Sequence, residues 1–510
     1  MRDMAATRTP RENLRHANNR VANDAQLHFI VSTDIEKPNP NLRKFIRSHV
    51  MLGKNRGKTR SVEKKRQRAT EDVPVVTPHT STVDTLNPNE QSISSAVAST
   101  TASQPILPLT IPRKFGSDIS SMSFPDAVEP RTVEVVLKFS SIAKQILFPL
   151  EPCVFFERRA QTWVEPLTFD PVFLHTMIFT SQSYFDVVAT GRTLAATKVA
   201  LHHFVKALKL LRERISRDDT HVTLSDNTLA AIMAFAGHAL LTGDYKLAMN
   251  HVEGLRKIVS LRGGVSTFKS NPKLLIEILR CDIGMVLHRG SKPVFFNQTT
   301  PGEPFMPYPD LTPLLELRGT STMASQNRTV VLLNDINGEL SGAWNTMSAF
   351  CSVANFAVES GQYISINTYL ETMASVVYRL FNMHFEPSSI KEAVRLGLLA
   401  FSTSVFLQWG QLGLSYTHLT SEFMGCLVKL VQPCASPQLM VWLMMVGAVS
   451  VLNIVDDVWL KSLLAANMGL SDIQSWDEMQ DLLNQFMWVR LVHDKAAKRV
   501  FDRLSSSTVG

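Results

Sequence analysis

The sequence predicts an all-α fold, a single large helical domain that follows a basic N-terminal arm and a spacer rich in Ser, Thr and Pro. Apolar residues make up 45% of the 510 residues, which is enough for a large core. Beyond residue 130 they recur at helical spacing, and alternating strand patterns are scarce. The formal charge of +7 is unevenly spread, because residues 1–70 hold 17 Lys and Arg against 6 Asp and Glu. The arm therefore carries a net charge of +11 and the remainder −4.

Composition divides the chain into three zones. Residues 1–70 form the basic arm, which we expect to be largely disordered apart from a short amphipathic helix near 40–51. Residues 71–128 contain 17 Ser or Thr and 7 Pro, and such a segment cannot bury enough apolar surface to offset its ordering entropy. We therefore expect this linker to be disordered. Residues 129–505 form the predicted all-α domain.

Within this domain, helices are predicted from the period of the apolar residues and from stop signals. Pro149 and Pro152 end the first helix, and Gly263-Gly264 can end the fourth by adopting a left-handed cap. Six prolines between 290 and 342 predict a long loop with one short helix at most. The predicted helices are 131–148, 193–215, 226–241, 245–262, 272–289, 343–358, 365–383, 388–411, 416–431, 436–455 and 475–493.

The arm contains the densest positive charge of the chain. Residues 43–68 hold 11 basic residues and one acid, Glu63. Three interpretations stay open: a nuclear-import signal, phosphate contact with nucleic acid driven by counterion release, or a solvated basic linker without a partner. Such a run supplies affinity without reading base sequence. The candidate phosphate contacts are Arg43, Lys44, Arg47, Lys54, Arg56, Lys58 and Arg60. The candidate import residues are Lys58, Arg60, Lys64, Lys65, Arg66 and Arg68.

Cysteine usage excludes a zinc cluster in the arm. The first of the five cysteines is Cys153, and the chain has no CxxC pair. An odd count of five in 510 residues also excludes a disulfide framework and fits a reducing compartment. The polar first 20 residues lack the apolar region of a secretory signal.

No enzyme signature is present, and we expect neither catalysis, a metal nor a cofactor. The sequence has no GxGxxG after a strand, no P-loop, no HExxH and no GxSxG. His202 and His203 are adjacent and cannot face one metal from the same helix face. The uncharged run 439–455 is predicted to be a buried helix and not a membrane span, and Asp456-Asp457 to be charges at a helix N-terminus. Three methionines in this run, Met440, Met444 and Met445, either fill an irregular core or line an adaptable pocket.

Several stretches resemble one family. Residues 243–264, which include Gly254-Leu255 and Leu261-Arg262-Gly263-Gly264, look like the core of the fungal-specific transcription factor domain, the helical middle homology region of fungal zinc binuclear cluster regulators. Asp282 to Phe295 and the helix from Trp442 to Val449 are also similar to that family. The leader 43–51 resembles that of fungal proteins lacking the zinc cluster, some labelled "tachykinin family protein".

The resemblance implies an all-α regulatory domain of a fungal nuclear protein, without the zinc cluster that reads DNA in family members. We therefore expect a nuclear transcriptional regulator or co-regulator whose arm supplies import and non-specific DNA contact. Expected partners are DNA through the arm, a nuclear import receptor, and the transcription machinery or a zinc-cluster protein. A homodimer is an open expectation. The alternative is a cytoplasmic helical scaffold that binds a protein or a small apolar ligand and has no DNA role.

Overall fold

The computed structural model describes residues 123–155, 164–186, 198–217, 219–268, 270–296, 304–316, 338–412, 414–430, 436–454 and 457–506. All of them belong to one of the two compact units into which the chain divides. The predicted arm and most of the predicted linker, including the expected helix near 40–51, lie outside these residues.

The described part of the chain is all-α, as the sequence predicts. It contains 17 α-helices and a two-stranded parallel sheet in which β1 (Val154–Phe155) pairs with β2 (Ile364–Ser365). The helices before the loop region are α2 (Pro130–Leu147), α4 (Pro166–Phe169), α5 (Pro171–Tyr184), α6 (Lys198–Ser216), α7 (Thr220–Thr223), α8 (Asp226–Leu241), α9 (Tyr245–Arg262) and α10 (Pro272–Arg289). Those after it are α11 (Thr312–Glu316), α13 (Gly338–Ser360), α14 (Ile366–Asn382), α15 (Ile390–Ser402), α16 (Thr417–Lys429), α17 (Pro437–Ser450), α18 (Val458–Leu470), α19 (Trp476–Phe486) and α20 (Arg490–Ser506). Shorter helical turns are η3 (Val265–Phe268), the π-helix η5 (Thr403–Leu407) and η6 (Trp409–Leu412).

Three predicted helices have the same first and last residues in the structure, and local capping explains this agreement. Helix α8 begins after Ser225, whose hydroxyl accepts the backbone N–H of Thr228. Helix α9 begins after Asp244, which caps it in the same way, and ends at Gly263 with a φ of 108°. That left-handed conformation is the one the predicted glycine cap requires. Helix α10 begins at Pro272 and ends before a second left-handed glycine, Gly290.

Two predicted helices are interrupted inside their predicted ranges, and two others differ in their ends: 343–358 is α13 (Gly338–Ser360), and 436–455 ends at Ser450. The range 475–493 is divided into α19 and α20, because residues 487–489 are extended and buried: the indole N–H of Trp442 donates to the Met487 carbonyl, and that of Trp488 to Asp494. The range 388–411 continues past α15 as the π-helix η5 and then reverses at Gln408, whose φ of 56° is left-handed. Because the chain reverses there, carbonyl groups at the end of η5 can accept hydrogen bonds from other parts of the fold.

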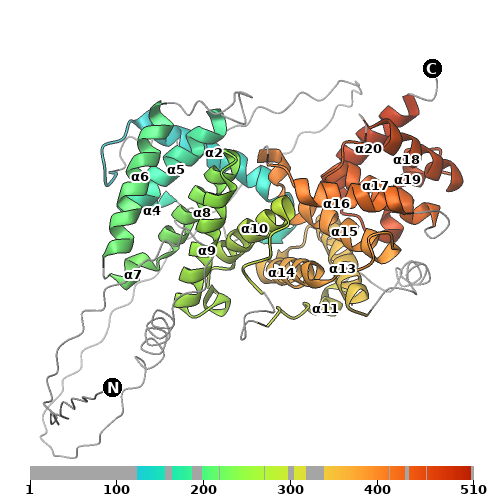
Figure 1. Ribbon diagram of the computed structural model, residues 1–510, viewed down its shortest axis with the longest axis horizontal. Coiled ribbons are helices and arrows are strands. Elements are labelled where there is room, and N and C mark those ends of the chain that lie inside the picture. Colours follow the sequence, from blue (N-terminus) through green and yellow to red (C-terminus); the bar gives the residue numbers. More distant parts are fainter. Residues whose placement is uncertain are drawn as a thin grey trace, which may run out of the picture. The chain divides into compact units, whose positions relative to one another are not determined.

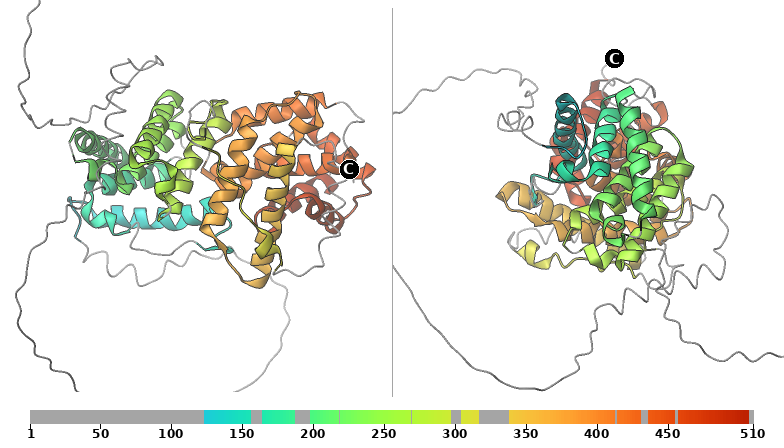
Figure 2. Two further views of the ribbon diagram at one scale, coloured as in Figure 1. Left: turned by 90° about the horizontal axis from the view of Figure 1, so that it is seen from below. Right: turned by 90° about the vertical axis from the view of Figure 1, so that its left-hand side faces the viewer.

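Helix α10 connects the two halves of this helical unit. It packs against α8 and α9 on the N-terminal side and against α14 and α16 on the C-terminal side. Figure 1 shows α10 between the green helices α8 and α9 and the orange helices α14 and α16. The left view of Figure 2 shows the same order of the coloured segments from below. One large apolar cluster includes side chains from both halves, and a small second cluster gathers under α2, α4 and α5.

Helix α17 is buried on all sides, as predicted for the uncharged run. Every residue from Leu439 to Gly447 is buried, and Met440, Met444 and Met445 therefore fill the core. Among the residues described here, no helix combines the length and apolar character needed to cross a membrane. Asp457 caps α18 by accepting the backbone N–H of Leu460, as predicted, while Asp456 lies outside the described residues.

A close contact on α10 gives a test of this packing. A Cβ atom at Gly284 would lie 2.0 Å from two ring carbons of Trp409, whereas one at Gly254 in α9 would meet nothing within 4 Å. We expect Gly284→Ala to lower the free energy of unfolding by about 1–3 kcal/mol through overpacking. The matched change Gly254→Ala should raise it by up to about 1 kcal/mol, because alanine is the better helix former. Urea unfolding of both variants measures this, and equal effects would contradict the packing of Trp409 on α10.

Candidate functional site

All candidate site residues of the arm, from Arg43 to Arg68, lie outside the described residues. What the structure does show is a set of buried polar groups in the helical unit, and these are the positions at which specific chemistry could reside.

Arg280 on α10 is a fully buried cation. Its guanidinium donates to the carbonyls of Leu147 (2.5 Å) and Leu407 (2.8 Å), the last residues of α2 and of η5. Carbonyls at helix C-termini have no partner within their helix and carry partial negative charge. The guanidinium also lies 4.9 Å from the ring centroid of Phe148, a cation–π contact. Arg280 therefore joins three helices from distant parts of the chain.

Asp282, two residues further along α10, is also fully buried. Its carboxylate accepts the backbone N–H groups of Val294 (3.0 Å) and Phe295 (3.1 Å) and the hydroxyl of Tyr378 (2.9 Å) on α14. Burial raises the pKa of Asp282 to about 7, against the opposite effect of these hydrogen bonds. In the Asp282-to-Phe295 stretch noted in the sequence, the Asp282 carboxylate therefore holds the segment that follows α10 against this helix.

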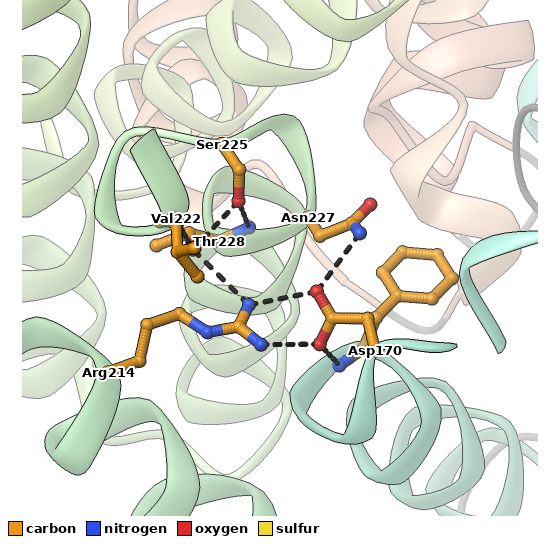
Figure 3. A network of polar contacts seen from close by, with 7 residues as sticks. Asp170, Arg214, Val222, Ser225, Asn227 and Thr228 are labelled. Atoms are coloured by element: carbon orange, nitrogen blue, oxygen red, sulfur yellow. Dashed lines mark hydrogen bonds and ion pairs between the residues drawn. The ribbon is translucent and has the colours of Figure 1, made fainter. Parts of the chain in front are cut away.

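A third polar centre holds α5, α6 and α8 together (Figure 3). Asp170 caps α5 by accepting the Phe173 N–H and forms a two-point ion pair with Arg214 at the end of α6, at 2.5 and 3.0 Å. Asn227 in the first turn of α8 donates to the same carboxylate (3.0 Å). Both side chains of the ion pair are less than one-tenth exposed. Arg214 and the other polar contacts hold the pKa of Asp170 below its usual range against burial.

A fourth centre couples two histidines. The Nδ1 atoms of His175 on α5 and His203 on α6 lie 2.7 Å apart, and both rings are buried. His175 Nε2 lies 3.1 Å from Asp126, which also forms an ion pair with Lys206. Burial, above all, lowers the pKa of both rings, that of His203 to about 4. Sequence reasoning missed this pair, because the two residues are 28 positions apart and no motif links them.

A buried serine–histidine pair, Ser404 and His493, has the wrong proton arrangement for catalysis. The Val489 N–H donates to His493 Nδ1 (3.3 Å), so the proton of the neutral ring is on Nε2 and is donated to Ser404 Oγ (2.8 Å). A general base must instead accept the serine proton. Burial also lowers the pKa of His493 to about 3. The pair therefore serves packing.

The described cysteines are equally unsuited to chemistry. Cys153, Cys281, Cys351 and Cys426 are free thiols, and burial raises the pKa of all four, for example to about 11 for Cys153. Nucleophilic cysteines need a lowered pKa. Within the described ranges no group of three or more His, Cys, Asp or Glu could hold a metal ion.

The ion pair in Figure 3 can be tested against an exposed one. We expect Asp170→Asn to lower the free energy of unfolding by about 3–5 kcal/mol, because it leaves the buried Arg214 unpaired while asparagine can still cap α5. The control Glu253→Gln breaks the largely exposed pair with Arg256 on α9 and should cost less than about 1 kcal/mol. Chemical unfolding of both variants gives the comparison, and a loss for Asp170→Asn no larger than the control's would contradict the buried pair.

Comparison with known proteins finds a family match for one part of the chain. Residues 179–280 match the sequence model of the family described as fungal specific transcription factor domain. No curated protein and no solved structure matches the chain. The matched range begins within α5, ends at Arg280 and contains the 243–264 stretch, while Asp282 to Phe295 and Trp442 to Val449 lie beyond it. Residues 179–280 are therefore similar to the fungal specific transcription factor domain, a domain named for its occurrence in transcription factors.

Proposed function

We propose that the protein is a fungal nuclear transcriptional regulator or co-regulator that lacks a zinc cluster of its own. The observation that carries this proposal is the family match over α6 to α10. The buried polar centres support a structural, non-catalytic helical domain, since the charged groups of each are paired or hydrogen-bonded within the unit. Such a domain suits regulatory contacts with the transcription machinery or with a zinc-cluster partner.

The basic arm supplies the second part of the proposal. Its 11 basic residues between 43 and 68 give nuclear import and non-specific contact with DNA phosphates. Sequence-specific reading is not part of its role, because the arm contains no cysteine for a zinc cluster and a dense basic run contacts only the backbone. Target selection then depends on a partner protein.

Localisation of a fluorescent fusion tests import. We expect the full chain to accumulate in the nucleus and the variant with Lys64, Lys65, Arg66 and Arg68 changed to Ala to lose most of that accumulation. The matched control removes four exposed cations of the helical unit, Lys209, Arg212, Lys246 and Lys257, and should stay nuclear. A wild-type fusion that remains cytoplasmic would contradict import and favour the alternative scaffold function.

Salt dependence of binding tests the phosphate contacts. We expect the full chain to bind unrelated DNA duplexes with similar affinity, which falls by about 10³-fold or more between about 50 and 200 mM salt if six or more phosphates are contacted. Changing Arg43, Lys44, Arg47, Lys54, Arg56, Lys58 and Arg60 to Ala should flatten this dependence, whereas the same four-cation control should keep it. Fluorescence anisotropy measures both, and an affinity independent of salt would rule out arm–phosphate contact.

A further inference from the structure

The His175–His203 pair lies where the described chain enters its first long helix. Residues 123–129 precede α2, and Asp126 in this segment contacts His175 of α5 and Lys206 of α6. Phe124 and Val128 from the same segment pack on the small apolar cluster formed with α2, α4 and α5. Few apolar contacts therefore hold the segment, and the polar contacts of Asp126 carry much of its attachment.

We propose that His175 and His203 form an acid-sensitive latch, which holds residues 123–129 against α5 and α6 when the pair is neutral and releases them when it becomes doubly protonated. The argument begins with the positions of the protons. A carboxylate can only accept, so His175 Nε2 carries a hydrogen toward Asp126. The Nδ1 of the neutral His175 ring is then an acceptor, and the hydrogen between the two rings belongs to His203 Nδ1.

This arrangement limits how many protons the closed latch can hold. One additional proton can bind His203 Nε2 without breaking the chain of hydrogen bonds. A second would have to enter between two Nδ1 atoms that are 2.7 Å apart and already share a hydrogen. The doubly charged pair is therefore incompatible with the closed geometry, and the rings must separate.

The surrounding charges make even the first proton unfavourable. His202 and Lys206 on α6 both disfavour positive charge on the rings, and Asp126 is the opposing carboxylate. On the other helices packed against α5, Lys138 of α2 lies over the Phe185 ring and His238 of α8 packs against Phe179 and Phe204. Arg131 and Glu134 of α2 are exposed.

The sign of the pH dependence follows from these contacts. The closed state lowers the pKa of both rings, that of His203 from 6.5 to about 4, so the open state takes up the two protons more readily once the pH falls below about 6.5. The stabilisation of the closed latch is fully present above about pH 6.5 and is lost as the pH falls toward 4. The main core lies elsewhere, so release of residues 123–129 should precede global unfolding.

Hydrogen–deuterium exchange of the full chain tests the latch. We expect the protection of peptides that cover 123–135, corrected for the intrinsic pH dependence of exchange, to fall roughly tenfold or more between about pH 7.5 and 4.5 while peptides of α10 and α17 stay protected. In His203→Asn, a side-chain amide that does not titrate can either donate to or accept from His175 Nδ1. Its protection over 123–135 should therefore change less than threefold over the same range.

Two further variants make the result decisive. Asp126→Asn removes the carboxylate and should release the segment already at neutral pH, even if His203→Asn folds poorly. The control His251→Asn alters a half-buried histidine, which stacks on Phe235 of α8, and should leave the acid response of 123–135 unchanged. Loss of protection only together with α10 and α17, an unchanged response in His203→Asn, or full neutral protection in Asp126→Asn would each overturn the latch.

Discussion

Arg280 requires partners wherever it is placed, because a guanidinium buried without them would cost several kcal/mol. The fold supplies the last carbonyls of α2 and η5, two groups left over by helix geometry and separated by about half the chain. Their positions are therefore set by one side chain on α10. Asp282 imposes the same constraint in the opposite sense, since its carboxylate needs the N–H groups that follow α10 and the Tyr378 hydroxyl. Together these two residues make α10 the element on which both halves of the helical unit are aligned.

This constraint bears on what the family match means. The matched range 179–280 is not self-contained, because its buried cations have partners outside it. Arg214 pairs with Asp170, and Arg280, which also pairs with Glu277 inside the range, donates to the carbonyls of Leu147 and Leu407. An isolated fragment of that range would leave Arg214 without its carboxylate and Arg280 without the two carbonyls that it binds. The cooperative structure is thus the larger helical unit, and regulatory contacts proposed for the matched range involve the helices from α2 to η5 as well.

Sequence reasoning succeeded for helices whose start and stop signals lie within a few residues of their ends. Helices α8, α9 and α10 have polar caps, apolar stripes and left-handed glycines, and their bounds could be read directly. Helix α5 was missed because it is buried on several sides and has no polar face to reveal its period. The break at 487–489 and the partners of Arg280 depend on contacts more than 40 residues away, which periodicity cannot show. Two charges inside the apolar run 278–287 were the available signal for the α10 anchors, and the His175–His203 pair had none.

We expect the arm and the helical unit to respond differently to ionic strength, because their charges lie in different surroundings. In our proposal, the basic side chains of the arm attract DNA phosphates while both are exposed to water. Salt at about 0.15 M screens such attraction beyond roughly 8 Å. The buried charges of the helical unit are paired at hydrogen-bond distance: Asp170 with Arg214, and Arg280 with two carbonyls. Salt screens such buried contacts little, so their strength should change little with ionic strength. Ionic strength therefore separates the proposed nucleic-acid contact from the integrity of the regulatory fold. Loss of DNA binding at high salt, while the helical unit stays folded, is therefore the result that the proposed arm contact predicts.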